Sequence, residues 1–214
     1  LIASTPLQID LTLVRVADPL SKSTPEDYLQ NFYSTWEDVR AKKFDGFVVT
    51  GAPIANMPFE DVRYWPEMLE IMDWTQTNVH HTMFICWGAQ AALHHLHGVK
   101  RYRMEHKAFG VYRHKVLDTR HPFLRGFSDD LAVPVSRYND IDRKSLSPDL
   151  DILIDSDEVG ICMLDDRKYR AAYMLNHLEY DNTSLADEYH RDVEAGLETL
   201  VPELDQRNLP DNAL

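Results

Sequence analysis

Cysteine is scarce in this chain of 214 residues, which contains only Cys86 and Cys162. Two cysteines cannot build the disulfide framework of a small secreted domain, and free thiols suit a reducing compartment. The chain also lacks an apolar run of the ~18 residues that a membrane-spanning helix needs, and it lacks a recognisable signal peptide. We therefore expect a cytoplasmic protein that does not cross a membrane.

A positive net charge is missing as well. The chain carries 35 acidic and 22 basic side chains, a formal charge of -13, which argues against nucleic acid or an anionic membrane surface as the main partner. A phosphorylated small molecule remains compatible with this balance, because a few local basic side chains suffice to bind it. The run at 100–103, with Arg113 and Lys115, is one candidate phosphate site, and a solvated loop is the alternative.

Apolar runs alternate with amphipathic segments in the first half of the chain. Runs at 47–49 and 83–85 predict buried strands, and apolar spacing predicts helices over 65–78 and 87–97. This alternation predicts an α/β fold with an open, mostly parallel sheet flanked by helices. Further expected elements are a strand over 8–13, a helix from Thr24 to Val39, short strands after Gly98 and a helix over 184–200. We expect one domain over 1–214, with more of the natural chain at both ends.

Cys86 stands between a predicted strand and a predicted helix. A residue at such a turn lies above the carboxyl ends of the strands, where open α/β folds bind their ligands. The amides at the start of a helix lower a thiol's pKa and stabilise a developing oxyanion, and Gly88 suits a tight turn. The pattern predicts a cysteine nucleophile on a strand-turn-helix elbow. Cys162 falls within an alternating strand and is expected to be inert.

A thiolate needs a base, and His177 is the best placed of ten histidines. It follows an apolar strand, and Glu179 comes two positions later, where an extended chain points both side chains the same way. Glu179 would then orient the imidazole as the third member of a triad; the alternative is a histidine that only hydrogen-bonds in a loop. The histidines at 94–97 have no acidic or cysteine partner at zinc-like spacing, so no metal site is expected.

Five motifs together resemble those of the homoserine O-acyltransferases, of the homoserine O-succinyltransferase type. They are Thr50-Gly-Ala-Pro53, Cys86-Trp-Gly-Ala-Gln90, Ser136-Arg-Tyr138, His177-Leu-Glu-Tyr-Asp181 and Arg191-Asp-Val-Glu-Ala-Gly196. The resemblance covers nearly the whole chain. It implies a class I glutamine-amidotransferase-like (flavodoxin-like) fold. It also implies an enzyme that moves an acetyl or succinyl group from acyl-CoA to the hydroxyl of L-homoserine, in methionine biosynthesis.

The resemblance implies roles for individual residues in a ping-pong mechanism. The catalytic positions are Cys86 as nucleophile, His177 as base and Glu179 as its partner; the substrate-binding positions are Lys107, Ser136 and Arg191; the oxyanion and acyl pocket is Ile54, Ala55 and Trp87. A fixed guanidinium also suits the carboxylate of an amino acid on physical grounds. The expected partners are the amino acid, acyl-CoA as co-substrate and a second copy of the chain, with no permanently bound cofactor and no metal.

The chain departs from the family pattern in two motifs, and the donor and the acceptor both stay open. Members of the family usually have the sequence Gly-His-Pro-Glu where this chain has Asn176-His-Leu-Glu179. After Ile54 the family has glycine with succinyl-CoA or glutamate with acetyl-CoA, and Ala55 matches neither. Serine could replace homoserine as the acceptor, as in the serine O-acetyltransferases of cysteine biosynthesis, because one methylene is worth only ~1–3 kcal/mol in a pocket. Two rival functions on the same fold are a glutamine amidotransferase that uses the same three side chains and a binding module without activity.

Overall fold

The computed structural model describes residues 6–17, 31–54, 57–197, 199 and 201. The chain forms two compact units. Unit 1 falls within residues 1–47 and 57–80, and unit 2 falls within residues 48–56 and 81–214. The single domain expected from the sequence stays a prediction.

Unit 1 is built around aromatic side chains. It contains a parallel pair of short strands, β1 (Val14–Arg15) and β2 (Ser34–Thr35), the helices α2 (Trp36–Val39) and α3 (Trp65–Asn78), the 3-10 turn η1 (Phe59–Asp61) and the start of β3 (Phe44–Val49). The ring of Trp74 on α3 lies edge-on to Trp36, with centroids 4.9 Å apart, and also contacts Phe44 and Phe47. These contacts form an aromatic cluster that links α2, α3 and β3.

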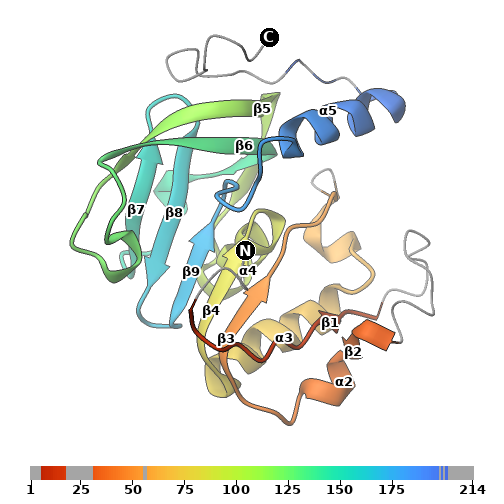
Figure 1. Ribbon diagram of the computed structural model, residues 1–214. Coiled ribbons are helices and arrows are strands. Elements are labelled where there is room, and N and C mark those ends of the chain that lie inside the picture. The colour runs from red at the N-terminus through yellow and green to blue at the C-terminus, as the bar shows by residue number, and fades with distance from the viewer. Residues whose placement is uncertain (1–5, 18–30, 55–56, 198, 200, 202–214) are drawn as a thin grey trace. The chain divides into compact units, whose positions relative to one another are not determined.

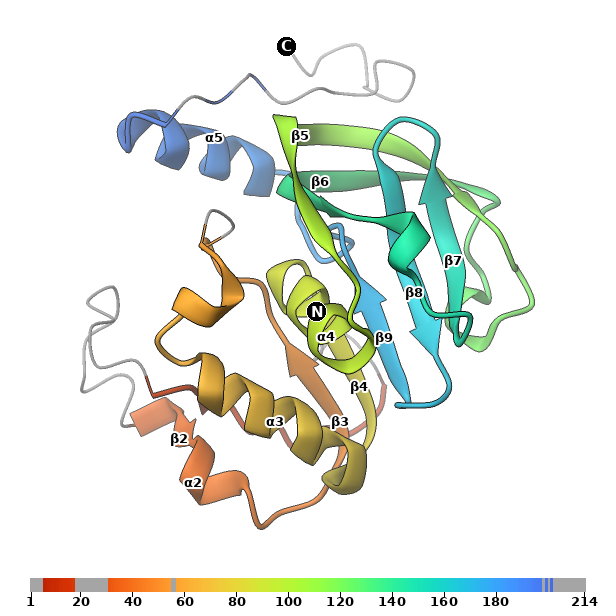
Figure 2. The same cartoon turned by 180° about the vertical axis from the view of Figure 1, so that it is seen from behind.

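Unit 2 holds most of a seven-stranded sheet with the order β3-β4-β9-β8-β7-β5-β6. Its strands after β3 are β4 (Val79–Ile85), β5 (Arg101–Val116), β6 (Asp130–Ile141), β7 (Leu150–Ser156), β8 (Gly160–Asp166) and β9 (Ala171–Met174). The helices are α4 (Trp87–His97) and α5 (Ser184–Glu194), with short 3-10 turns η2 (Pro122–Leu124) and η3 (Arg143–Ser145). Figures 1 and 2 show from opposite sides that α5 lies beside the ends of β5 and β6.

The α/β fold is confirmed, but the sheet is mixed rather than mostly parallel. β4 and β9 pair in parallel, whereas the pairs β5–β6, β5–β7, β7–β8 and β8–β9 are antiparallel. The turns from β7 to β8 and from β8 to β9 are short, and a short turn permits only antiparallel pairing. Parallel pairing is kept at β4 and β9, which are joined through a long stretch of intervening chain.

The sequence predicts some element boundaries better than others. The bounds predicted for α3 and α4 are confirmed. The strand predicted over 8–13 is wrong, since β1 begins at Val14, and the helix predicted as far as Val39 is interrupted by β2. The part of that helix over 24–30 lies outside the described residues, and α5 ends at Glu194, before the predicted end.

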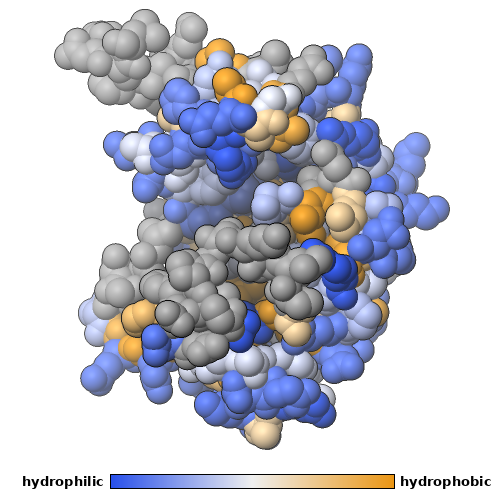
Figure 3. All heavy atoms as spheres, turned by 90° about the vertical axis from the view of Figure 1, so that its right-hand side faces the viewer, coloured by the Kyte–Doolittle hydropathy of each residue, from blue (hydrophilic) through white to orange (hydrophobic). Residues whose placement is uncertain are grey.

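Hydrophilic side chains dominate the face shown in Figure 3, and the hydrophobic ones form small, separate groups. In the part of the chain that the structure describes, no helix combines the length and the apolar character needed to span a membrane.

Candidate active site

Cys86 lies on a sharp turn between β4 and α4. It is the N-cap of α4 with φ 53° and ψ -114°, a conformation that costs energy for any residue with a side chain. Two glycines allow the backbone to come close. A Cβ on Gly88 would lie 3.1 Å from the carbonyl oxygen of Thr50, and a Cβ on Gly51 would lie 3.1 Å from the Cβ of Cys86. The predicted strand-turn-helix elbow is therefore present, with Cys86 at its apex.

The parallel pairing of β4 with β9 brings His177 to the same edge of the sheet as the elbow. Ile85 is aligned with Met174, and the amide of Cys86 donates a 2.7 Å hydrogen bond to the carbonyl of Met174. The chain that leaves β9 is then tied to β6, because the amide of His177 donates to the carbonyl of Pro134 at 3.0 Å. These main-chain bonds set the position from which the imidazole reaches the sulfur.

Cys86, His177 and Glu179 form one hydrogen-bonded group. The imidazole bonds to the side chain of Cys86, and its Nδ1 lies 2.7 Å from Oε1 of Glu179, which leaves Nε2 as the nitrogen available to the sulfur. Burial lowers the pKa of His177, but the bonds and charges of Cys86 and Glu179 outweigh it and raise the pKa to about 9. At neutral pH the ring is therefore an imidazolium beside the sulfur. The structure brings together all three residues predicted as catalytic.

Two further side chains of this site were missed by the sequence analysis. Tyr180 stacks on the ring of His177, with centroids 4.1 Å apart, and its hydroxyl donates to Glu188. Burial and this bond raise the pKa of Tyr180, so the hydroxyl stays protonated. Glu188 also accepts a bond from the hydroxyl of Ser136. Glu188 was detectable in the sequence, because it lies one helical turn before Arg191 on α5.

Lys107 and Arg191 meet at a shared carboxylate, Asp192. Nζ of Lys107 lies 2.8 Å from Oδ2 of Asp192, and Nη2 of Arg191 lies 2.9 Å from Oδ1. Burial opposes charge on Asp192, but Lys107 and Arg191 hold its pKa below the usual range. Lys107 also lies 3.7 Å from Glu188 and 3.8 Å from the centre of the Phe109 ring. This ion-pair cluster fixes α5 to β5 and sets the direction of Arg191.

The triad and the ion-pair cluster line a single pocket of about 450 Å³ within unit 2. Its lining includes the predicted residues Cys86, Trp87, Lys107, Ser136, His177, Glu179 and Arg191, together with Thr50, Gly51, Tyr138, Tyr180, Glu188 and Asp192. Ile54 is not part of the lining, and its amide donates to the carbonyl of Ala52 at 2.8 Å. The amide of Ile54 is thus used within a tight turn, and the role of Ile54 in the oxyanion and acyl pocket stays a prediction. Ala55 lies outside the described residues.

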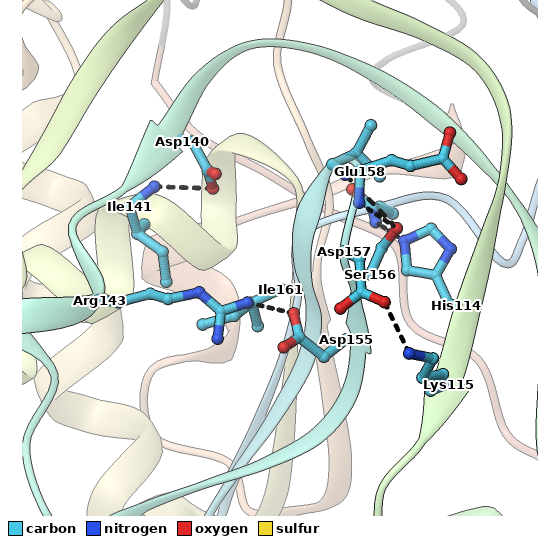
Figure 4. A network of polar contacts seen from close by, with 12 residues as sticks. His114, Lys115, Asp140, Ile141, Arg143, Asp155, Ser156, Asp157, Glu158 and Ile161 are labelled. Carbon is cyan, nitrogen blue, oxygen red and sulfur yellow. Dashed lines mark hydrogen bonds and ion pairs between the residues drawn. The ribbon is translucent and has the colours of Figure 1, made fainter.

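The basic residues proposed for phosphate binding do not gather at this pocket. Lys115 forms a 2.6 Å ion pair with Asp157, visible as a dashed line in Figure 4, and Arg113 pairs with Asp130 at 3.3 Å. Neither Lys115 nor Arg113 lines the pocket. Arg103 differs from them, because its guanidinium lies 4.4 Å above the ring of Tyr138, a pocket residue.

Cys162 lies in β8 and is fully buried. Burial raises the pKa of its thiol to about 12, so that it stays protonated. Among the residues that the structure describes, no group of three or more histidine, cysteine or acidic side chains is arranged to hold a metal ion.

Comparison with known proteins gives one family and one fold. The profile of the homoserine O-succinyltransferase family (HTS) matches residues 1–212. A homoserine O-succinyltransferase of Pelagibacterium halotolerans is 93% identical over 99% of this chain and 71% of its own length. A homoserine O-acetyltransferase of Hyphomonas neptunium is 54% identical over 94% of this chain and 67% of its own length. A glutamine amidotransferase structure from Thermotoga maritima superimposes with a TM-score of 0.61 at 16% identity, covering 80% of this chain and 77% of the other; this likeness shows the fold alone.

Proposed function

Because this chain belongs to the homoserine O-succinyltransferase family, we propose that its pocket transfers an acyl group from acyl-CoA to the side-chain hydroxyl of homoserine by way of Cys86. Members of the family are acyltransferases, and acylation of homoserine belongs to methionine biosynthesis. The observation that carries the proposal is the contact of Cys86 with the imidazole of His177, which Glu179 orients. That group lies in a pocket that also contains Arg191, a receptor for a carboxylate.

In the first half-reaction the Cys86 thiolate attacks the thioester carbonyl of acyl-CoA. The bond from the acyl carbon to the sulfur of coenzyme A breaks, and the leaving thiolate takes the proton of the His177 imidazolium. The acyl group is then a thioester on Cys86. Cys86 is the N-cap of α4, and amides at the start of this helix would stabilise the negative charge that develops on the carbonyl oxygen.

In the second half-reaction His177 acts as the general base. Once Cys86 is acylated it carries no charge, and the two contributions of Cys86 that raise the pKa of His177 are lost, while burial still lowers it. The neutral ring accepts the proton of the homoserine hydroxyl, and the oxygen attacks the acyl carbon. The bond to Cys86 breaks, the ester leaves, and the thiolate-imidazolium pair forms again.

The charges of the pocket suit an amino acid as the acceptor. Arg191 offers a guanidinium, and its side chain is 57% exposed, so a carboxylate can approach it. Glu188 provides the opposite charge on the same helix and already accepts bonds from Tyr180 and Ser136. A zwitterion placed between Arg191 and Glu188 would find a partner for each of its charged groups.

We propose succinyl-CoA as the preferred donor. Succinate carries a terminal carboxylate that needs room and is repelled by negative charge. At position 55 alanine brings neither the bulk nor the charge of the glutamate that the family has with acetyl-CoA. The relative that is 93% identical bears the name homoserine O-succinyltransferase, which supports the same choice.

Release of free coenzyme A thiol tests the function directly. Four mixtures combine acetyl-CoA or succinyl-CoA with serine or homoserine. We expect sustained release to be fastest with succinyl-CoA and homoserine, and a single burst of about one thiol per active site when the amino acid is omitted, because the acyl-cysteine then accumulates. Faster release with serine would make serine the acceptor. Ammonia released from glutamine, with no thiol released in any mixture, would favour an amidotransferase instead.

Replacing Arg191 with alanine is expected to weaken binding of the acceptor homoserine and to leave the reaction with acyl-CoA nearly unchanged. We expect KM for homoserine to rise about 10- to 100-fold, since a charge-assisted hydrogen bond is worth about 1.5–3 kcal/mol, with little change in the burst of thiol release. Steady-state kinetics with each substrate varied in turn measures both quantities. Arg120 is a suitable control, because its side chain is 90% exposed and pairs with Asp118 outside the pocket lining. An equal rise of KM for acyl-CoA would contradict the assignment.

A further inference from the structure

A chain of buried polar side chains lies behind His177. It consists of His114 on β5, Asn176 immediately before His177, and Cys162 on β8, each 0% exposed. The proposed transfer reaction uses none of these side chains. A buried imidazole bonded to the residue next to a proposed general base therefore needs an explanation.

The hydrogen bonds of His114 define its tautomer. Its Nδ1 lies 3.0 Å from the carbonyl oxygen of Tyr112, which can only accept, so Nδ1 carries the hydrogen. Burial lowers the pKa of His114, and the positive charge of Arg137 acts in the same direction, against Asp155 and Asp130. The ring is therefore neutral and its Nε2 is an acceptor. It accepts from Nδ2 of Asn176 at 2.9 Å. In Figure 4, His114 lies beside Lys115 on β5, and Lys115 is paired with Asp157.

The side chain of Asn176 is held mainly by this bond. Its Nδ2 also faces the thiol of Cys162, a weak partner, and its Oδ1 is buried without a hydrogen-bond partner in the described part of the chain. The main chain on each side is tied down: the amide of Leu175 donates to the carbonyl of Cys162 at 2.7 Å, and the amide of His177 donates to that of Pro134 at 3.0 Å. Asn176 thus links the interior directly to the peptide that carries His177.

We propose that His114 is a positioning residue for His177 and acts through the side chain of Asn176. The inference rests on the proposed function, because it assigns His177 the role of general base. The neutral ring of His114 fixes the Asn176 amide, the amide fixes the peptide before His177, and the imidazole stays within reach of Cys86. A displacement of about 1 Å at such a residue can cost about 10²-fold in rate.

The test compares His114→Leu with His114→Gln. Leucine fills the space without an acceptor, whereas a glutamine Oε1 can accept from Asn176 near the place of Nε2. We expect His114→Leu to slow formation of the acyl-cysteine about 10- to 100-fold with KM for homoserine unchanged, and the pKa of His177, followed by NMR, to fall below about 9 because contact with Cys86 weakens. His114→Gln should restore most of the rate. His121→Leu removes a histidine whose side chain is 10% exposed and lies 3.3 Å from Asp165, outside the pocket lining, and it should leave both readouts unchanged.

A double mutant tests the route through Asn176. In an Asn176→Ala background, His114→Leu should add little further loss of rate, since the link is already broken. The inference is overturned if the two losses multiply, or if His114→Leu lowers only Tm and leaves the rate and the pKa of His177 unchanged. Wild-type protein that never forms the acyl-cysteine would reject the proposed function instead, and the pKa of His177 would still test the positioning role.

Discussion

Turnover is expected to fall by about 10⁴- to 10⁶-fold when Cys86 is replaced with alanine, the size of loss seen when a catalytic nucleophile is removed. Cys86 is the only residue that we propose to bond covalently to the acyl group, and no other thiol is available nearby in a reactive form, since burial keeps Cys162 protonated with a pKa of about 12. The fold of the turn should be retained, because alanine keeps the Cβ and the φ of 53° is equally unfavourable for both residues.

Intact-mass measurement after incubation with acyl-CoA and no acceptor checks this result. Wild-type protein should gain one acyl group, and the modified peptide should contain Cys86. The Cys162→Ala variant should still gain the group on the same peptide. An adduct of equal yield on Cys86→Ala would show that the acyl group is carried elsewhere, and the proposed mechanism would then be wrong.

His177→Gln is expected to lower kcat by about 10²- to 10⁴-fold, the usual contribution of a general acid-base residue. Glutamine keeps a hydrogen-bonding side chain but cannot take up the proton of the homoserine hydroxyl. The substitution Glu179→Gln should lower kcat less than His177→Gln does. The imidazole remains in place and loses only its orienting bond of 2.7 Å to Glu179. Single-turnover measurements of acylation and deacylation separate these effects, and a variant without His177 that transfers normally would refute the role of base.

The pH dependence follows from the raised pKa of His177. The folded pKa of about 9 lies above the ordinary value of about 6.5. The contacts that raise the pKa of His177 therefore add stability that is fully present below about pH 6.5 and is lost as the pH rises through about 9. Wild-type Tm should fall over that interval more than Tm of His177→Gln. In Cys86→Ala the pKa of His177 should drop, because the hydrogen bond that raises it most is gone.

Local signals made part of this fold predictable. α3 and α4 have the bounds expected from apolar spacing, since one helix follows a proline-containing start and the other ends at Gly98 in the left-handed conformation. The direction of the strands was not predictable in the same way. Whether β8 pairs parallel or antiparallel with its neighbours depends on which strands meet, and a single strand's apolar pattern does not record its partner.

Part of the candidate active site was likewise predictable from local sequence, and part was not. Cys86, His177 and Glu179 stand next to predicted strand ends, so their meeting could be anticipated, and the structure places them together. The bond between His114 and Asn176 joins residues far apart in the chain, and nothing local marks His114 as different from the other histidines. The amide of Ile54 bonds inside its own loop, and the pocket role of Ile54 stays a prediction.

The sequence by itself determined the elbow at Cys86, the spacing of His177 and Glu179, and the family, because each is carried by residues close together in the chain or by motifs in a fixed order. Only the tertiary structure decided that the sheet is mixed, that Lys107 and Arg191 share Asp192, and that a buried imidazole stands behind His177. Those features arise from contacts between strands and helices distant in sequence. They exist only once the chain has folded and burial has made each polar group find a partner.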